Sequence, residues 1–288
     1  MTEIKQIPTD DPRLGRIVQH DPRSRAYAFK APRRLELVSK RHRRWIPVLD
    51  QGYLGSCTGN AGIGNMGSDP FYHNFTSDTL LDESAAIKLY SDATVIDEWE
   101  GSYPPDDTGS SGLAIAKVLK GRGWISGYQH TFTFDDMKAA LQNGPVLLGI
   151  NWYNNFYDPS YDGELTVASD DSVAGGHEIV VDEIDVENKR IWITNSWGEN
   201  WGVDGRAWFS WETMERLLHE DGDVVVLVPI DQPAPQPTPS EPTDEAASVA
   251  DEALWEAVKV WANSRRYGEN RKATKAVKEW AAKKGLTN

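Results

Sequence analysis

The sequence predicts an α+β protein, because two kinds of secondary structure follow one another along its compact part. From Cys57 to about residue 144, apolar residues recur mostly at helical spacing. From Pro145 onward the apolar stretches are short and rich in valine and isoleucine, as in strands. Helices and strands that segregate along a chain are typical of α+β architectures. We therefore expect a helical lobe and a strand-rich lobe within residues 45–230.

Three stretches are expected to form the helices. Residues 80–97 carry apolar side chains at helical spacing, and residues 113–119 (Leu-Ala-Ile-Ala-Lys-Val-Leu) predict a buried helix. A third helix is expected to open at Phe134. Asp135 and Asp136 follow it, and the helix dipole favours acidic residues in the first turn.

The expected strands are short apolar runs bounded by turn residues. Residues 184–186 and 190–194 flank a polar turn and predict a hairpin. The other expected strands are residues 146–150, 178–181, 206–209 and 224–228. Together these runs supply the strand-rich lobe.

The remaining segments are expected to lie outside the compact part. Residues 1–44 are basic and repeatedly interrupted by proline, which predicts an extended N-terminal arm that lies on the body or is partly mobile. Residues 231–245 form a proline-rich linker, expected to be extended. Residues 246–288 carry apolar residues, including Trp261 and Trp280, at helical spacing and predict a small basic helical hairpin.

The net charge of −14 conceals an asymmetry along the chain. Residues 46–245 hold 9 Lys and Arg against 34 Asp and Glu, a balance of −25, whereas residues 1–45 and 246–288 have balances of +7 and +4. An acidic body repels nucleic acid and attracts basic ligands, although a solvated surface also explains many of these charges. We expect no nucleic-acid partner, and we hypothesise an acidic or virion partner for the hairpin.

Cysteine content and hydropathy predict where the protein works. A single cysteine leaves no internal disulfide, so nothing argues for an oxidising compartment. Residues 1–20 are polar and lack the apolar core of a secretory signal. No apolar run approaches the roughly 20 residues of a membrane span. We expect a cytoplasmic protein without membrane contact, located in a host cytoplasm or a virion if it comes from a bacteriophage.

No cofactor and no metal are expected. The histidines, the cysteine and the acidic residues lack the spacings of zinc or calcium sites. Residues 62–67 match the Gly-x-Gly-x-x-Gly dinucleotide motif, but no strand precedes them, as that motif requires.

Cys57, the only cysteine, lies among glycines that allow another chain to approach closely. A helix that begins at Cys57 would stabilise its thiolate, which is the nucleophilic form. His177 follows a glycine pair at the head of a predicted core strand and is the candidate base. Asn195, at the end of the strand 190–194, offers an amide that can orient the histidine ring. These residue types in this order indicate nucleophilic catalysis by a cysteine.

Gln51 and Trp197 are expected to support this site. The Gln51 side-chain amide and the Cys57 backbone N–H are candidate donors to an oxyanion. Trp197 can cover the contact between Asn195 and His177 and keep water out. Each element alone is weak, because a lone cysteine is most often a small buried side chain and a histidine before a strand is usually structural. The ordered set of four favours catalysis.

Three stretches resemble the papain family of cysteine peptidases: residues 51–57 (Gln-Gly-Tyr-Leu-Gly-Ser-Cys), 176–181 (Gly-His-Glu-Ile-Val-Val) and 195–202 (Asn-Ser-Trp-Gly-Glu-Asn-Trp-Gly). His177 follows Cys57 by 120 residues and Asn195 follows it by 138, near the family's spacing. The resemblance covers about residues 45–230 and is strongest to bacterial and bacteriophage members. It implies a two-lobe fold with the active cleft between the lobes, Cys57 on the helical lobe and His177 on the strand lobe.

The resemblance also implies substrate-binding residues. A glycine-containing segment that binds substrate backbone in the family corresponds to residues 109–112, and a main specificity pocket lies beside the strand 145–150. The implied substrate-binding residues are Gly109, Ser110, Ser111, Gly149, Gly175 and Glu178. No long helical inhibitory prosegment is visible in residues 1–44. The chain is therefore either made active or restrained only by its basic arm.

We therefore expect a cysteine-type endopeptidase that cleaves peptide bonds through a Cys57–His177–Asn195 triad and an acyl-enzyme. The acidic body and Glu178 predict peptide or protein substrates with basic or polar residues near the cut. Two alternatives stay open. One is a virion-associated structural or adaptor protein on a protease fold. The other is acyl transfer on cell-wall peptides or other substrates by the same residues.

Overall fold

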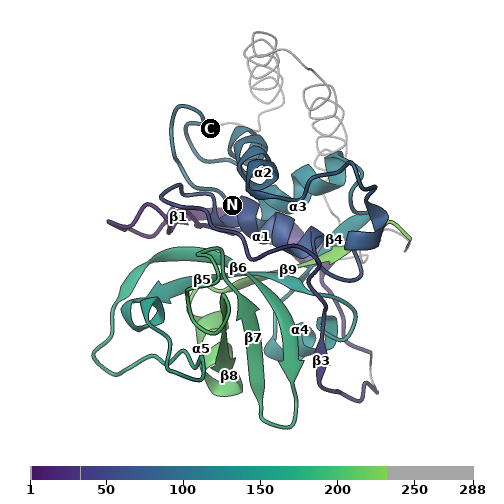
Figure 1. Ribbon diagram of the computed structural model, residues 1–288, viewed down its shortest axis with the longest axis vertical. Helices are drawn as coiled ribbons and strands as arrows, with labels where there is room; N and C mark the ends of the chain where they lie inside the picture. Colours follow the sequence, from purple (N-terminus) through teal and green to yellow (C-terminus); the bar gives the residue numbers. More distant parts are fainter. Residues whose placement is uncertain (1, 33, 232–288) are drawn as a thin grey trace.

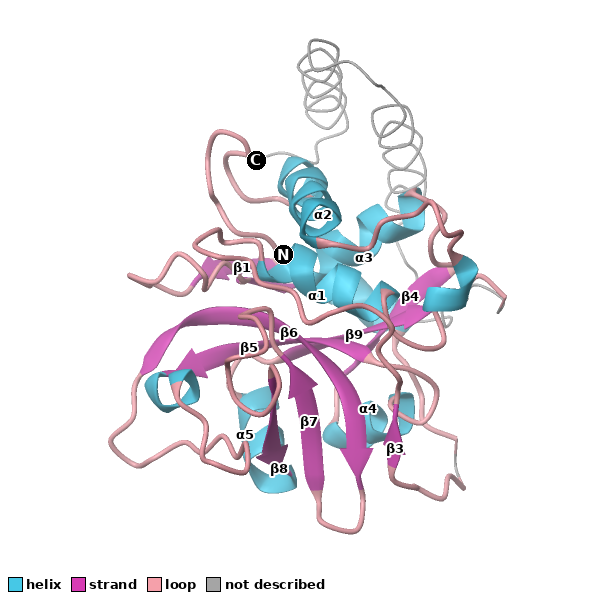
Figure 2. Cartoon of the chain, in the orientation of Figure 1, coloured by secondary structure: helices cyan, strands magenta, loops and turns pink. Residues whose placement is uncertain are grey.

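The computed structural model describes residues 2–32 and 34–231. The expected hairpin 246–288, and all of the expected linker 231–245 except its first residue, lie outside the described residues. Within the described part, three helices lie on one side of a mainly antiparallel sheet, as Figures 1 and 2 show. The predicted α+β class is confirmed.

Two of the three expected helices, over residues 80–97 and 113–119, lie in the helical lobe, whereas the one expected to open at Phe134 packs on the strand lobe. Asp82 caps the second helix of the helical lobe by accepting from the Ala85 amide, so that helix begins slightly later than residue 80. Ser111 caps the third by accepting from the Ala114 amide. The helices of this lobe are α1 (Cys57–Met66), α2 (Glu83–Ile96) and α3 (Gly112–Gly121).

The sheet of the strand lobe has the order β4-β9-β5-β6-β7-β8, with β3 paired to β6. The expected hairpin forms between β6 and β7, which pair antiparallel. The strands are β3 (Lys40–Arg41), β4 (Gly127–Thr131), β5 (Val146–Tyr153), β6 (Val173–Asp185), β7 (Arg190–Thr194), β8 (Arg206–Ser210) and β9 (Asp223–Val228). Helices α4 (Phe134–Ala140) and α5 (Trp211–His219) pack on the far side of the sheet.

Two hydrophobic cores share the central strands of the sheet. Leu147 and Val180 belong to the core under α1, α2 and α3, whereas Leu148, Ile179 and Val181 belong to the core with α4 and α5. Side chains alternate across a strand, so one strand can serve both layers. This explains why β5 is buried along its whole length.

The N-terminal arm is built into the body. Strands β1 (Glu3–Gln6) and β2 (Ile17–His20) pair antiparallel, and a 3₁₀ turn, η1 (Pro22–Tyr27), follows. Residues 14–19 are buried. In Figure 1 this purple segment lies at the level of α1, between the helices and the sheet.

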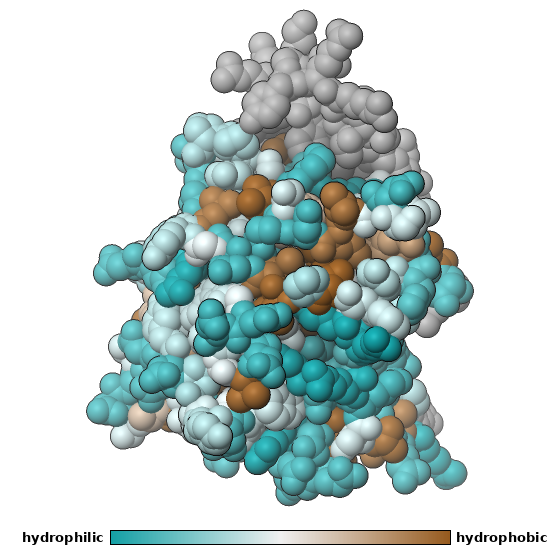
Figure 3. Space-filling view, viewed as in Figure 1, coloured by the Kyte–Doolittle hydropathy of each residue, from teal (hydrophilic) through white to brown (hydrophobic). Residues whose placement is uncertain are grey.

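The surface on the face drawn in Figure 3 is divided. Apolar side chains gather over the helical lobe, and the strand lobe is mainly polar. No helix among the described residues has the length and apolar character needed to cross a membrane.

Candidate active site

Cys57 is the first residue of α1 and is fully buried. Burial raises the pKa of its thiol to about 12, and backbone hydrogen bonds from Glu178, Gly15 and Thr58 partly oppose the shift. The expected stabilisation of the thiolate by the helix start is therefore outweighed in this conformation. Gly15 belongs to the N-terminal arm, so the arm itself contributes to the burial.

His177 and Asn195 meet because β6 and β7 are antiparallel neighbours. His177 Nε2 lies 2.7 Å from Asn195 Oδ1, which also accepts from the Ser196 amide at 2.8 Å. The other ring nitrogen, Nδ1, is buried without a hydrogen-bond partner among the described residues. Burial lowers the pKa of His177 to about 4, although the Asn195 hydrogen bond raises it.

Aromatic side chains enclose the histidine. The Trp197 and His177 ring centroids are 5.1 Å apart, and the Trp152 ring meets His177 edge-on at 4.7 Å. The Arg13 guanidinium lies over the Trp197 ring, 4.2 Å from the ring centroid, in a cation–π contact. Trp197 thus lies against the ring of His177, which Asn195 holds through Nε2.

Gln51 is oriented by the residue after Asn195. Ser196 Oγ donates to Gln51 Oε1 at 2.7 Å, which turns the Gln51 Nε2 group towards the arm. That group donates to the Arg13 carbonyl at 3.1 Å and to the Leu54 carbonyl at 2.7 Å. The amide that we expect to hold an oxyanion is thus occupied by two carbonyls of the same chain, only one of which, that of Arg13, belongs to the arm.

The arm crosses the site in contact with both walls. On one side, the Ile17 amide donates to the Ser110 carbonyl at 2.7 Å, and the Ser110 amide donates to the Gly15 carbonyl at 2.9 Å. On the other, the Arg16 amide donates to the Gly176 carbonyl at 3.1 Å. Both pairings are parallel bridges. The arm therefore fills the groove that a substrate backbone would need.

The six residues that the resemblance implies for substrate binding all lie close to this segment. Gly109 adopts a positive φ of +74°, and a Cβ there would collide with Gly15. A Cβ on Gly175 would lie 2.8 Å from the Leu14 side chain. Ser111 donates to Gln19 at 2.7 Å. Ser110 pairs with the backbone of the arm, and Gly149 and Glu178 lie against the Arg16 side chain.

Sequence reasoning missed the residues that hold the loops around Cys57. Asp107 accepts from the Gly55 amide at 2.9 Å and from the Tyr90 hydroxyl at 2.6 Å. Tyr90 in turn accepts from the Gly109 amide at 2.9 Å. Asp97 accepts from Ser110 Oγ at 2.7 Å, and burial raises its pKa to about 7. No spacing in the sequence marks these residues, because their partners are distant along the chain.

A scan against protein-family models and a search of curated proteins gave no match. Solved structures do match. Xylellain, a cysteine protease from Xylella fastidiosa, superposes with a TM-score of 0.62 at 20% identity, over 77% of this chain and 98% of that one. The fold is that of the papain-like cysteine proteases. The predicted papain-like fold is confirmed for the described residues.

Two further solved structures are similar to this papain-like chain. The bromelain protease from Ananas comosus, in complex with the E64 inhibitor, matches with a TM-score of 0.39 at 15% identity, over 66% of this chain and 99% of that one. Digestive procathepsin L2 from Tenebrio molitor larval midgut matches with a TM-score of 0.45 at 15% identity, over 72% and 80%.

No group of histidine, cysteine or acidic side chains within residues 2–32 and 34–231 could hold a metal ion. The groups that the described residues bring to this site are a thiol, an imidazole held by an amide, and backbone and Gln51 N–H groups.

Proposed function

We propose that the protein is a cysteine endopeptidase. The observations that carry this proposal are the 2.7 Å hydrogen bond between His177 and Asn195 and the hydrogen bond from the backbone of Glu178, the residue after His177, to the buried Cys57 thiol at the start of α1. A nucleophile, a base and an orienting group at these positions in a papain-like fold support peptide-bond hydrolysis.

The reaction follows from these groups. His177 Nδ1 takes the proton of the Cys57 thiol, and the thiolate sulfur attacks the carbonyl carbon of the scissile bond. The Gln51 amide and the Cys57 N–H stabilise the oxyanion, and removing one such donor costs about 3–4 kcal/mol of barrier. The imidazolium then protonates the leaving amine as the C–N bond breaks. Water attacks the thioester with His177 as base, which releases the carboxylic acid and the thiol.

We further propose that the chain is latent while the arm lies in the groove. The Arg13 carbonyl occupies the Gln51 amide, and the arm pairs with Ser110 and Gly176. The Gly15 backbone N–H donates to the Cys57 thiol. The arm therefore covers the nucleophile as well as the groove.

Thiol-directed labelling and peptide hydrolysis by wild type and Cys57→Ala test the peptidase proposal. An epoxide inhibitor is a suitable probe, since E64 is bound in the bromelain structure. Because the arm occupies the groove, we expect slow labelling of wild type and slow release of new amino termini from a protein substrate, and neither in Cys57→Ala. Unchanged hydrolysis by Cys57→Ala would contradict the assignment. Labelling without new amino termini would instead favour an acyl transfer.

A further inference from the structure

The Arg16 side chain occupies a closed pocket beside the candidate active site. It is completely buried, and its backbone amide is held by the Gly176 carbonyl. The residues on either side of it pair with Ser110 across the groove. A side chain that projects into the body from an extended segment next to the nucleophile lies where a substrate side chain would lie.

Two glycines make room for this side chain. A Cβ on Gly149 would lie 2.8 Å from both Asp223 Oδ1 and Glu178 Oε2, and it would overlap Arg16 Nε. A Cβ on Gly112 would collide with Glu178 Oε1. The space between the two carboxyl groups therefore depends on glycine at both positions.

The pocket has two carboxyl groups that face its occupant. Arg16 Nη2 pairs with Asp223 and donates to the Asp221 carbonyl at 2.6 Å, and Arg16 Nε lies 4.0 Å from Glu178 Oε2. Glu178 is fully buried, and neither of its oxygens has a hydrogen-bond partner among the described residues. A buried carboxylate without a cation nearby is costly. A neutral or acidic occupant would leave the Asp223 carboxylate without its cation. Burial and Asp223 raise the pKa of Glu178 well above its usual range and Arg16 opposes this shift, so a cationic occupant favours the charged form of Glu178.

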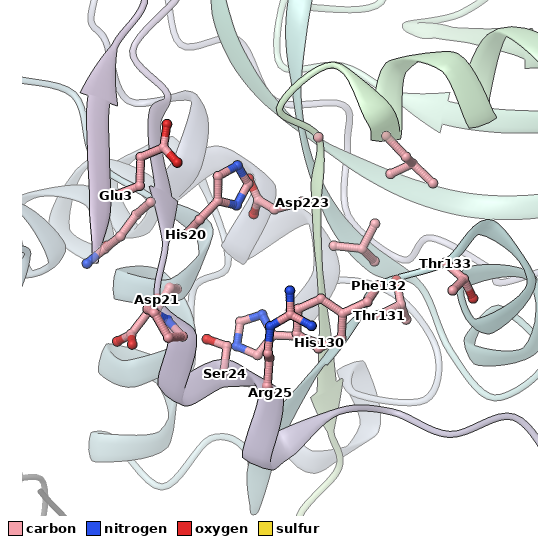
Figure 4. Close-up of a pocket in the computed structure, with 16 residues that line it drawn as sticks. Glu3, His20, Asp21, Ser24, Arg25, His130, Thr131, Phe132, Thr133 and Asp223 are labelled. Atoms are coloured by element: carbon pink, nitrogen blue, oxygen red, sulfur yellow. The ribbon is translucent and has the colours of Figure 1, made fainter. Parts of the chain in front are cut away.

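The Asp223 end of the pocket is the end nearer to solvent. Asp223 contributes to the wall of a cavity of about 420 Å³, and its side chain is 20% exposed, whereas Glu178 is 0% exposed. Figure 4 shows Asp223 next to His20 at the edge of this cavity. A side chain must be long to run from the groove past Glu178 to Asp223, as arginine does.

We propose that this pocket, between Glu178 and Asp223, selects an arginine side chain of the substrate, and that the arm closes the site by placing its own Arg16 there. The proposal rests on the proposed peptidase function and names its substrate class: peptides and proteins with arginine at one fixed position close to the scissile bond. Arginine is favoured over lysine because two nitrogens of one guanidinium approach the two carboxyl groups, Nη2 at Asp223 and Nε at Glu178, whereas an ammonium offers a single nitrogen.

The first test uses the full chain with Arg16→Ala, and Arg23→Ala as the matched control. Arg23 also belongs to the arm but pairs with Asp21 and Glu98 at the surface. We expect epoxide labelling of Cys57 to be about tenfold faster in Arg16→Ala, because a charge-assisted anchor of the arm is lost, and unchanged in Arg23→Ala. Equal labelling rates in wild type and Arg16→Ala would overturn the anchoring role.

The second test is the cleavage-site profile of Arg16→Ala on a peptide library, read by mass spectrometry. We expect arginine to be enriched at one position, and its advantage in kcat/KM over a matched leucine peptide to fall at least about tenfold in Arg16→Ala/Asp223→Asn. Cleavage without enrichment of arginine overturns the pocket proposal and leaves the peptidase standing. Absence of cleavage and labelling in every variant overturns the peptidase proposal, and the pocket with it.

A third measurement does not require Arg16→Ala to fold. In the full chain with Asp223→Asn, the amides of Arg16 and Ile17 should exchange with deuterium about tenfold faster than in wild type, because their hydrogen bonds to Gly176 and Ser110 open when the anchor weakens. Unchanged exchange at these two amides would show that Asp223 does not hold the arm.

Discussion

Asn195 accepts two hydrogen bonds, and these fix the protonation pattern of His177. The Ser196 backbone N–H donates to one side-chain atom of Asn195, so that atom must be the oxygen, Oδ1. His177 Nε2 faces the same oxygen and therefore carries a proton. When the ring is neutral, Nδ1 therefore carries no proton and can accept the proton of the Cys57 thiol. The tautomer needed for a base towards Cys57 is thus set by one amide.

Loss of this amide should reduce catalysis more than binding. In Asn195→Ala, we expect kcat for a peptide substrate to fall by about one to two orders of magnitude with little change in KM, because His177 loses its orientation. Steady-state kinetics check this. Asn188→Ala is the control, since Asn188 is an exposed amide in the turn between β6 and β7. Equal kcat values for the two variants would contradict the orienting role.

The pKa of Cys57 predicts an unusual pH dependence of alkylation. Burial raises this pKa to about 12, so the thiol stays protonated near neutral pH and becomes reactive only as pH rises towards that value. In urea the thiol should titrate at its ordinary pKa near 9. Alkylation rates by iodoacetamide, measured against pH in native and denatured protein, test the difference. A native profile that levels off near neutral pH would contradict it.

At the scale of elements, the loops around the site depend on a polar bridge between helices. Tyr90 on α2 and Asp107 join the loop before α1 to the loop before α3 through the amides of Gly55 and Gly109. Both loops lie against the arm. The bridge therefore fixes the width of the groove as well as the packing of the helical lobe.

Removal of the bridging hydroxyl should destabilise the fold. Tyr90→Phe leaves the Gly109 amide and one Asp107 oxygen without their partner, at a cost of about 1–3 kcal/mol in the free energy of unfolding. Urea denaturation measures this. Tyr161→Phe is the matched control, because the Tyr161 side chain is fully exposed. Equal unfolding free energies for both variants would show that the bridge contributes nothing to stability.

At the scale of the whole molecule, the arm joins two lobes that have separate cores. Leu14 packs in the core of the strand lobe, while the segment from Gly15 to Ile17 pairs with Ser110, just before α3 in the helical lobe. An insertion of this kind links closure of the site to the stability of the molecule. Buried histidines of the sheet extend that link to pH.

Acid should destabilise the protein partly through His130, a buried residue of β4. Burial lowers its pKa from 6.5 to about 4. The unfolded chain therefore binds a proton at this residue below about pH 6.5, whereas the folded chain does so only below about pH 4. The stability is present above pH 6.5 and is lost as pH falls. Between about pH 7 and pH 5 the loss from this residue is about 2 kcal/mol.

Comparison of wild type with His130→Gln isolates this contribution, because Asp97, with its raised pKa, acts in the opposite direction in both proteins. Urea denaturation at the two pH values should show a smaller loss of stability on acidification in His130→Gln. The same loss in both proteins would contradict a neutral, buried His130.

The sequence alone predicted the α+β class, the helices α2, α3 and α4, and the hairpin between β6 and β7. These features are encoded locally, in apolar spacing, caps and turns. It also singled out Gln51, Cys57, His177, Asn195 and Trp197; in the structure His177 contacts Asn195 and Trp197, and Gln51 contacts Ser196. Their catalytic roles are proposals, and the cytoplasmic location, the bacterial or bacteriophage origin and the partner of the hairpin 246–288 stay predictions.

Only the tertiary structure decided what residues 1–44 do. The sequence described a basic, proline-interrupted segment, and the structure threads it past Cys57 with Arg16 between Glu178 and Asp223. The parallel pairing of the arm with Ser110 and Gly176 produces no periodic pattern in the sequence, because the paired residues are far apart in the chain. The same distance hides the Tyr90–Asp107 bridge and the burial that sets the pKa of Cys57. Local patterns specify elements, whereas the groove and its occupant exist only after the lobes pack.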